Sequence, residues 1–134
     1  MEFKVPLANV PKKVHTVNTE LKKLPARFFR QESGNEPVRD WLVGLDAVDR
    51  KAVGDDIRTA EFGWPIGMPL CRKMSGRRGL WEVRTDLSHG RIARTFFCVH
   101  NGAMVLLHGF VKKSQKTPPK ELEIAERRMK GLSK

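Results

Sequence analysis

The feature that most constrains the fold is a change of hydrophobic periodicity near residue 69. Before this point apolar residues recur at helical spacing, whereas after it they alternate in short segments separated by turns. The expected strands are residues 70–74, 80–85, 91–99 and 103–111. Connections this short, including an Asn-Gly turn at residues 101–102 that tolerates positive φ angles, predict an antiparallel meander sheet of about four strands.

Two amphipathic helices are expected before the meander. Asn35 is the predicted N-cap of the first, whose apolar stripe is Val38, Trp41, Leu42 and Leu45. Asp46 is the predicted N-cap of the second, which ends at Gly63. A short strand over residues 24–30 and a C-terminal helix over residues 119–132 complete the pattern. The fold class is therefore α+β, with the helix pair packed on one face of the sheet.

The chain of 134 residues fits one domain, expected over residues 23–134 after an N-terminal arm over residues 1–22. The two cysteines, Cys71 and Cys98, are too few and too far apart for a zinc ribbon or a disulfide framework, so two reduced thiols are expected. No segment has the length and apolar character of a signal peptide or a membrane span, which favours a cytoplasmic protein with no membrane partner.

Positive charge is concentrated in the second half of the chain. The formal net charge is +11, and residues 69–134 carry 15 Lys and Arg against five acidic residues. Residues 1–68 carry 11 against ten. An excess confined to half of one domain favours a phosphate-binding surface, and the alternative is a basic protein with no such partner.

Alternation along the strands places Arg84 and Arg94, with His108, on the face that the helix pair does not cover. It also groups Leu106 with His108 and Phe110 on one face. Arginine holds a phosphate through paired hydrogen bonds, and cations stabilise the charge that builds up when a ribose 2′-hydroxyl attacks phosphorus. A histidine or lysine transfers the protons in such a reaction. These residue types on one face favour RNA cleavage without a metal or a cofactor.

Structural alternatives compete with each of these interpretations. Glu82 and Arg84 share a strand face, so Glu82 can pair with Arg84 or Arg94 in a structural ion pair. His108 has no metal-ligand partner at useful spacing, and a packed histidine is the simpler interpretation. The basic segment over residues 76–79 is either a phosphate-contacting loop or a solvated turn.

Five segments resemble the phage-derived HigB-like branch of the RelE/ParE toxin superfamily. They are ESGNEPVRDWL (32–42), GLWEVR (79–84), RIARTFF (91–97), LLHGFVKKSQKTP (106–118) and ELEIAERRMKGL (121–132). The resemblance covers about residues 24–132 and implies a RelE-like fold. It also implies the toxin of a type II toxin–antitoxin module, an mRNA endoribonuclease acting on the ribosome that inhibits translation. The partners implied are mRNA and a helix-turn-helix antitoxin.

The residue roles follow from the faces and from the resemblance together. The expected catalytic residues are Arg84, Arg94, Lys113 and His108. The expected RNA-binding residues are Arg72, Lys73, Arg77, Arg78, Lys112, Gln115 and Lys116. Two other functions stay open: a non-catalytic ParE-type toxin that poisons DNA gyrase, and a plain RNA-binding module. Fold alone does not separate them.

Overall fold

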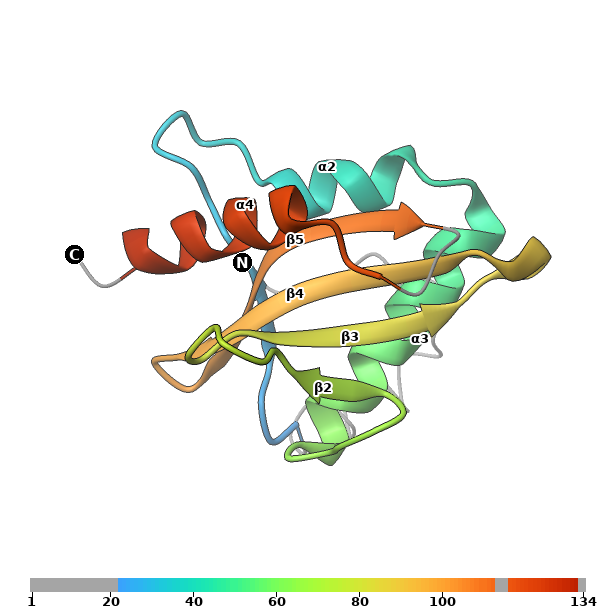
Figure 1. Ribbon diagram of the computed structural model, residues 1–134, viewed down its shortest axis with the longest axis horizontal. Helices are drawn as coiled ribbons and strands as arrows, with labels where there is room; N and C mark the ends of the chain where they lie inside the picture. Colours follow the sequence, from blue (N-terminus) through green and yellow to red (C-terminus); the bar gives the residue numbers. More distant parts are fainter. Residues whose placement is uncertain (1–21, 113–115, 133–134) are drawn as a thin grey trace, which may run out of the picture.

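The computed structural model describes residues 22–112 and 116–132, which form an α+β domain (Figure 1). The predicted arm before Lys22 lies outside the described residues, as do Lys113 and Gln115. In chain order the elements are β1 (Ala26–Phe28), α2 (Pro37–Gly44), α3 (Ala47–Gly63), β2 (Cys71–Lys73), β3 (Trp81–Asp86), a 3₁₀ turn (Ser88–Gly90), β4 (Ile92–His100), β5 (Ala103–Lys112) and α4 (Pro119–Gly131).

The first two helices form close to where the sequence predicts them. Asp46 caps α3 as expected, because its side chain accepts a hydrogen bond of 2.9 Å from the backbone N–H of Asp49. The prediction for α2 is wrong by one residue, since Glu36 and not Asn35 is the N-cap. The Glu36 carboxylate makes no capping bond, and it lies 3.5 Å from the Arg30 guanidinium instead. Pro37, whose fixed φ suits a first helical turn, starts the helix without a side-chain cap.

The sheet has five strands in the order β1-β5-β4-β3-β2. Strands β2 to β5 pair antiparallel in sequence order, which confirms the predicted meander. However, β1 pairs parallel with β5, where Ala26 lies opposite Met104, so the sheet is mixed and not the purely antiparallel sheet expected. A parallel neighbour requires a long crossover connection, here through α2, α3 and the meander, and local periodicity does not reveal such a pairing.

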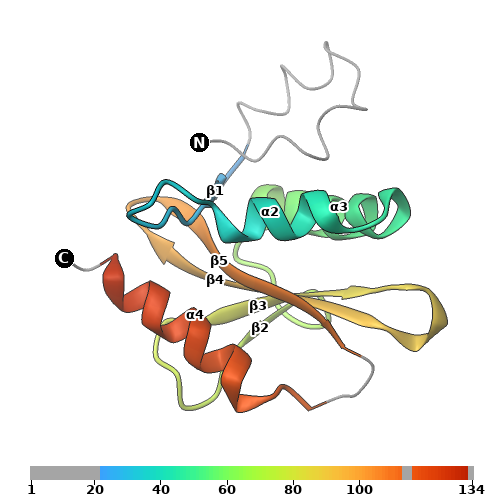
Figure 2. The same ribbon diagram turned by 90° about the horizontal axis from the view of Figure 1, so that it is seen from above.

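The sheet lies between two helical layers. Figure 2 shows α2 and α3 over one face and α4 over the other. The core under α2 and α3 contains Ile57 and Phe97, and the core under α4 contains Phe96 and Ala125. The two cysteines are free and buried, and they belong to opposite cores, which confirms the expected reduced thiols.

A bulge in β5 changes which residues share a face. Phe96 lies opposite His108, whereas Phe97 lies opposite Leu106, so β5 carries one additional residue at this point. The predicted grouping of Leu106 with His108 is therefore wrong. Leu106 packs in the core under α2 and α3, whereas His108 and Phe110 stack on the side of α4.

Candidate functional site

The face of the sheet that carries α4 is only partly covered. Helix α4 packs against β5 and β4, and Figure 1, which looks onto this face, shows β3 and β2 with no helix in front of them. Alternate residues of four strands bring four cationic side chains together here. One is Lys112, and the other three are arginines that lie close enough to lower its pKa. We call these residues, with the carboxylate among them, the basic cluster: Arg72, Glu82, Arg84, Arg94 and Lys112.

A buried ion pair forms the inner part of the basic cluster. The Arg94 guanidinium donates hydrogen bonds of 3.1 and 2.9 Å from Nη1 to the two oxygens of Glu82. Glu82 is 0% exposed and Arg94 is 1% exposed. The side chain of Arg94 does lie on the predicted face, and it is buried against Glu82, while its predicted contact with a phosphate stays a prediction. The structural alternative, a pair between Glu82 and Arg94, is confirmed.

Arg72 links this buried pair to the surface. Its Nε lies 3.0 Å from Oε2 of Glu82, while its side chain remains 41% exposed. Glu82 therefore orients one buried and one exposed arginine. Because Nε makes the internal contact, the terminal nitrogens of Arg72 can still donate to a ligand.

Arg84 lies directly opposite Arg94 in the register of β3 and β4. Its Nε is shielded from solvent and has no hydrogen-bond partner within the part of the chain that the structure describes. An unsatisfied buried donor of a charged group is costly. A phosphate oxygen of a ligand would satisfy this donor.

Lys112, the last residue of β5, also has a donor nitrogen that is shielded from solvent. Its Nζ is shielded from solvent and meets no hydrogen-bond acceptor among the described residues. Burial lowers the pKa of Lys112, and the positive charges of Arg94, Arg72 and Arg84 lower it further, against the opposing effect of Glu82. A lysine in this environment gives up its proton more readily than one in water.

The basic cluster thus holds four cations and one carboxylate. Within the described residues, Nε of Arg84 and Nζ of Lys112 meet no acceptor although both are shielded from water. Phosphate oxygens satisfy such donors, and arginine matches them in paired geometry. The arrangement has the charge and the hydrogen-bond donors that an anion site requires, at the point where the sheet is left open.

His108 occupies a separate position beneath α4. Its Nε2 lies 2.5 Å from the Glu121 carboxylate, and its ring stacks against Phe96 and Phe110. Burial lowers the pKa of His108, although Glu121 acts in the opposite direction. This packing supports the structural interpretation of His108, and its predicted catalytic role stays a prediction.

The remaining predicted residues do not join the basic cluster. Lys73 is exposed on β2 next to Arg72, so strand alternation directs it to the opposite face. Arg77 lies 2.6 Å from Glu126 and ties the turn before β3 to α4. Arg78 and Lys116 are exposed.

The sequence did not lead us to predict that α4 places a carboxylate and a guanidinium next to His108. Glu121 contacts Nε2, and Arg128 donates a hydrogen bond of 2.8 Å to the backbone oxygen of Leu107. These two residues are seven positions apart, which places them on one face of a helix. That spacing could have indicated that the two residues share one face of α4.

Comparison with known proteins assigns the chain to a family. Residues 40–130 match the family described as Phage derived protein Gp49-like (DUF891), and the chain belongs to it. No curated protein matches the sequence. No helix among residues 22–112 and 116–132 is long and apolar enough to cross a membrane. No group of three metal-ligating side chains occurs in the same described segments.

Proposed function

We propose that the chain is a HigB-like toxin of a type II toxin–antitoxin module and that it cleaves mRNA at the basic cluster. Two observations support this proposal. The chain belongs to the Gp49-like phage-derived family, which is associated with toxin–antitoxin modules. The observation that carries the proposal is the pair of shielded donors, Nε of Arg84 and Nζ of Lys112, that have no acceptor among the described residues.

The proposed reaction is attack of a ribose 2′-hydroxyl on the adjacent phosphorus. A base removes the proton of the 2′-hydroxyl, the bond from phosphorus to the 5′-oxygen breaks, and an acid protonates that oxygen. The products are a 2′,3′-cyclic phosphate and a 5′-hydroxyl. Negative charge grows on the phosphate oxygens in the transition state, where preorganised cations stabilise it most.

In this proposal the residues of the basic cluster have different roles. Arg84 and the exposed end of Arg72 bind the phosphate. Lys112, with its lowered pKa, transfers a proton. Arg94 is a positioning residue, because it is buried and holds Glu82, which in turn fixes Arg72.

The proposed partners follow from the same account. Ribosome-bound mRNA is the proposed substrate, and the charge of +11 supports capture of such a polyanion. A helix-turn-helix antitoxin encoded beside the gene is the proposed inhibitor. Its co-expression is expected to suppress the toxicity of the chain.

Induced expression in cells tests the proposal and separates its alternatives. The wild type is expected to arrest growth with rapid loss of translation and new cuts in mRNA. Arg84→Ala should abolish both effects while the protein stays folded. Lys73→Ala is the matched control, since it removes an equal charge from the opposite face and should retain activity. DNA damage with intact mRNA would instead support a gyrase poison, and retention on RNA without cleavage would support a plain binding module.

A further inference from the structure

The basic cluster presents three partly exposed cationic groups from three different strands. They are Arg72 on β2, Arg84 on β3 and Lys112 on β5, whereas Arg94, on the strand between the last two, is buried against Glu82. Arg72 and Arg84 both lie close enough to Lys112 to lower its pKa. Neighbouring strands are about 5 Å apart, so side chains of this length can converge on one ligand. A ligand held here is contacted from three directions.

Each of the three groups has donors to offer. Nε of Arg84 and Nζ of Lys112 are shielded from solvent and meet no acceptor among the described residues. Arg72 contacts Glu82 at 3.0 Å through Nε, which leaves its terminal nitrogens to bind a ligand. A matching ligand therefore brings at least three acceptors and reaches into the cluster as far as the two shielded nitrogens.

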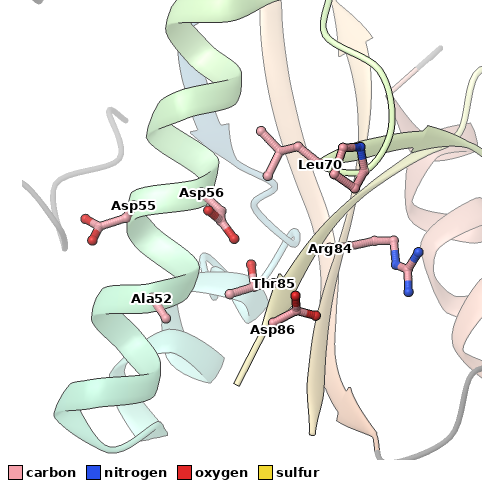
Figure 3. A pocket seen from close by; sticks show the side chains of 8 residues that line it. Ala52, Asp55, Asp56, Leu70, Arg84, Thr85 and Asp86 are labelled. Atoms are coloured by element: carbon pink, nitrogen blue, oxygen red, sulfur yellow. The ribbon is translucent and has the colours of Figure 1, made fainter. Parts of the chain in front are cut away.

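Arg84 is kept apart from the acidic side of the sheet. Asp56 and Thr85 line a pocket between α3 and β3, and Figure 3 shows the Arg84 side chain extending away from both. Thr85 follows Arg84 in β3, so strand alternation directs the two side chains to opposite faces. The Asp56 carboxylate therefore does not supply the acceptor for Nε of Arg84, and a ligand on the face of the basic cluster can do so.

The number of acceptor oxygens distinguishes two kinds of phosphate. A phosphate at the end of a nucleic-acid strand has three oxygens bonded only to phosphorus, whereas an internal phosphodiester has two. Arg72, Arg84 and Lys112 can each bind one of the three. A terminal phosphate is also attached to a single sugar, so it approaches shielded donors more easily than a phosphate between two sugars.

The charge of the basic cluster favours the same kind of phosphate. Its four cations and one carboxylate leave an excess of three positive charges. A terminal phosphate carries close to two negative charges at neutral pH, and a phosphodiester carries one. The second charge offsets more of the repulsion among the cations. In the proposed reaction the transition state also gains negative charge on the phosphate oxygens, so a site that fits it favours a dianion as a ligand.

We infer that the basic cluster binds the terminal phosphate of an RNA strand in preference to an internal phosphodiester, and that RNA ends of this kind inhibit the protein. Free inorganic phosphate has the same chemistry, but the net charge of +11 adds attraction for a ligand that continues as a strand. The inhibition rests on the proposed function, whereas the binding preference does not.

Binding of 2′-O-methyl oligonucleotides, measured by fluorescence anisotropy, tests the preference without cleavage, since the attacking hydroxyl is blocked. One sequence is compared with a 3′-phosphate, with a 5′-phosphate and with hydroxyl groups at both ends. A phosphate at either end is expected to tighten binding roughly tenfold at physiological ionic strength. Lys112→Met should lose most of this preference. Lys73→Met, which removes an equal charge from the opposite face, should keep it.

NMR signals of the arginine Nε–H groups locate the ligand on the wild type, independently of how the variants fold. The phosphate-ended oligonucleotide should shift the signals of Arg72 and Arg84. The signal of Arg91 should stay, because Asp49 holds its guanidinium through hydrogen bonds of 2.7 and 3.1 Å. A shift of Arg91 without a shift of Arg84 would overturn the inference.

The remaining outcomes separate the inference from its alternatives. Equal affinity of the three oligonucleotides would overturn it, and so would inorganic phosphate binding as tightly as the phosphate-ended strand. If the protein cleaves RNA, a phosphate-ended oligonucleotide that binds without slowing cleavage would contradict the inhibition. Tighter binding of phosphate ends without any RNA cleavage would uphold the binding preference and defeat the proposed nuclease, and cleavage without an end preference would do the reverse.

Discussion

Arg84 and Arg94 lie directly opposite each other on β3 and β4, so two guanidinium groups occupy neighbouring positions on one face of the sheet. Like charges in this relation destabilise a sheet. Glu82 compensates Arg94 through two hydrogen bonds, but the Nε of Arg84 has no acceptor within the described residues. The pair gives this face a concentration of positive charge that suits an anion, as the proposed function requires.

Replacing Lys112 by Met is expected to stabilise the protein. Burial and the neighbouring arginines lower the pKa of Lys112, so its charged form is less favourable in the folded protein than in the unfolded chain. A group whose pKa is lowered in the folded protein contributes to stability only at pH values above its ordinary pKa, here 10.5. It loses that contribution as the pH falls. At pH 7 the substitution should raise the free energy of unfolding by about 1 kcal/mol in urea denaturation. An equal or lower stability would contradict the unpaired placement of Lys112.

Replacing Glu82 by Gln is expected to destabilise the protein strongly. The change removes the Glu82 carboxylate from the charged and buried Arg94, which costs about 3 kcal/mol. Urea denaturation of Glu126→Gln provides the control, because the pair of Glu126 with Arg77 is partly exposed and should cost less than about 1 kcal/mol. Similar losses for the two variants would argue against a special role of the buried pair.

Gly109 is required by the close approach of helix α2 to β5. A Cβ atom at Gly109 would lie 2.3 Å from two carbons of the Trp41 ring. Gly109→Ala should therefore lower the free energy of unfolding by about 2 kcal/mol, because the ring has to move within a packed core. At Gly44 a Cβ meets nothing within 4 Å, so Gly44→Ala should instead stabilise α2 by about 0.5 kcal/mol. Thermal unfolding of the two variants compares these effects.

Acidification is expected to weaken the contact of α4 with the sheet through His108. Burial lowers the pKa of His108 in the folded protein, despite the opposing effect of Glu121 and with a smaller contribution from Arg128. Its contribution to stability is therefore present above the ordinary value of 6.5 and is lost as the pH falls below it. His108→Gln should reduce the decrease in melting temperature between pH 7 and pH 5. An unchanged pH dependence in His108→Gln would refute this role.

Local sequence signals account for most of the elements. The stripe in α2, the Asp46 cap and the alternation from β2 to β5 depend on residues close together in the chain, so they were predictable. The parallel pairing of β1 with β5 was not, because it joins residues almost 80 positions apart. The bulge before His108 was also not predicted. The hydrophobic pattern of β5 is compatible with a regular strand as well as with one that carries an additional residue.

The candidate site was predictable in composition but not in detail. Strand alternation correctly grouped Arg84 with Arg94, yet it did not show that Glu82 takes Arg94 out of solvent. Which cation a buried carboxylate binds depends on rotamers and register, which periodicity does not specify. The pocket at Asp56 and Thr85 was missed because α3 and β3 meet only in the folded chain.

The most direct test of the central claim is the rate at which the purified protein produces 2′,3′-cyclic phosphate ends on an RNA oligonucleotide. Lys112→Met is expected to be at least about 100-fold slower than the wild type, although it is expected to be the more stable protein. Lys73→Met, with the same change of charge on the opposite face, should react at the wild-type rate. Equal rates for Lys112→Met and the wild type would contradict the claim that the basic cluster performs the chemistry.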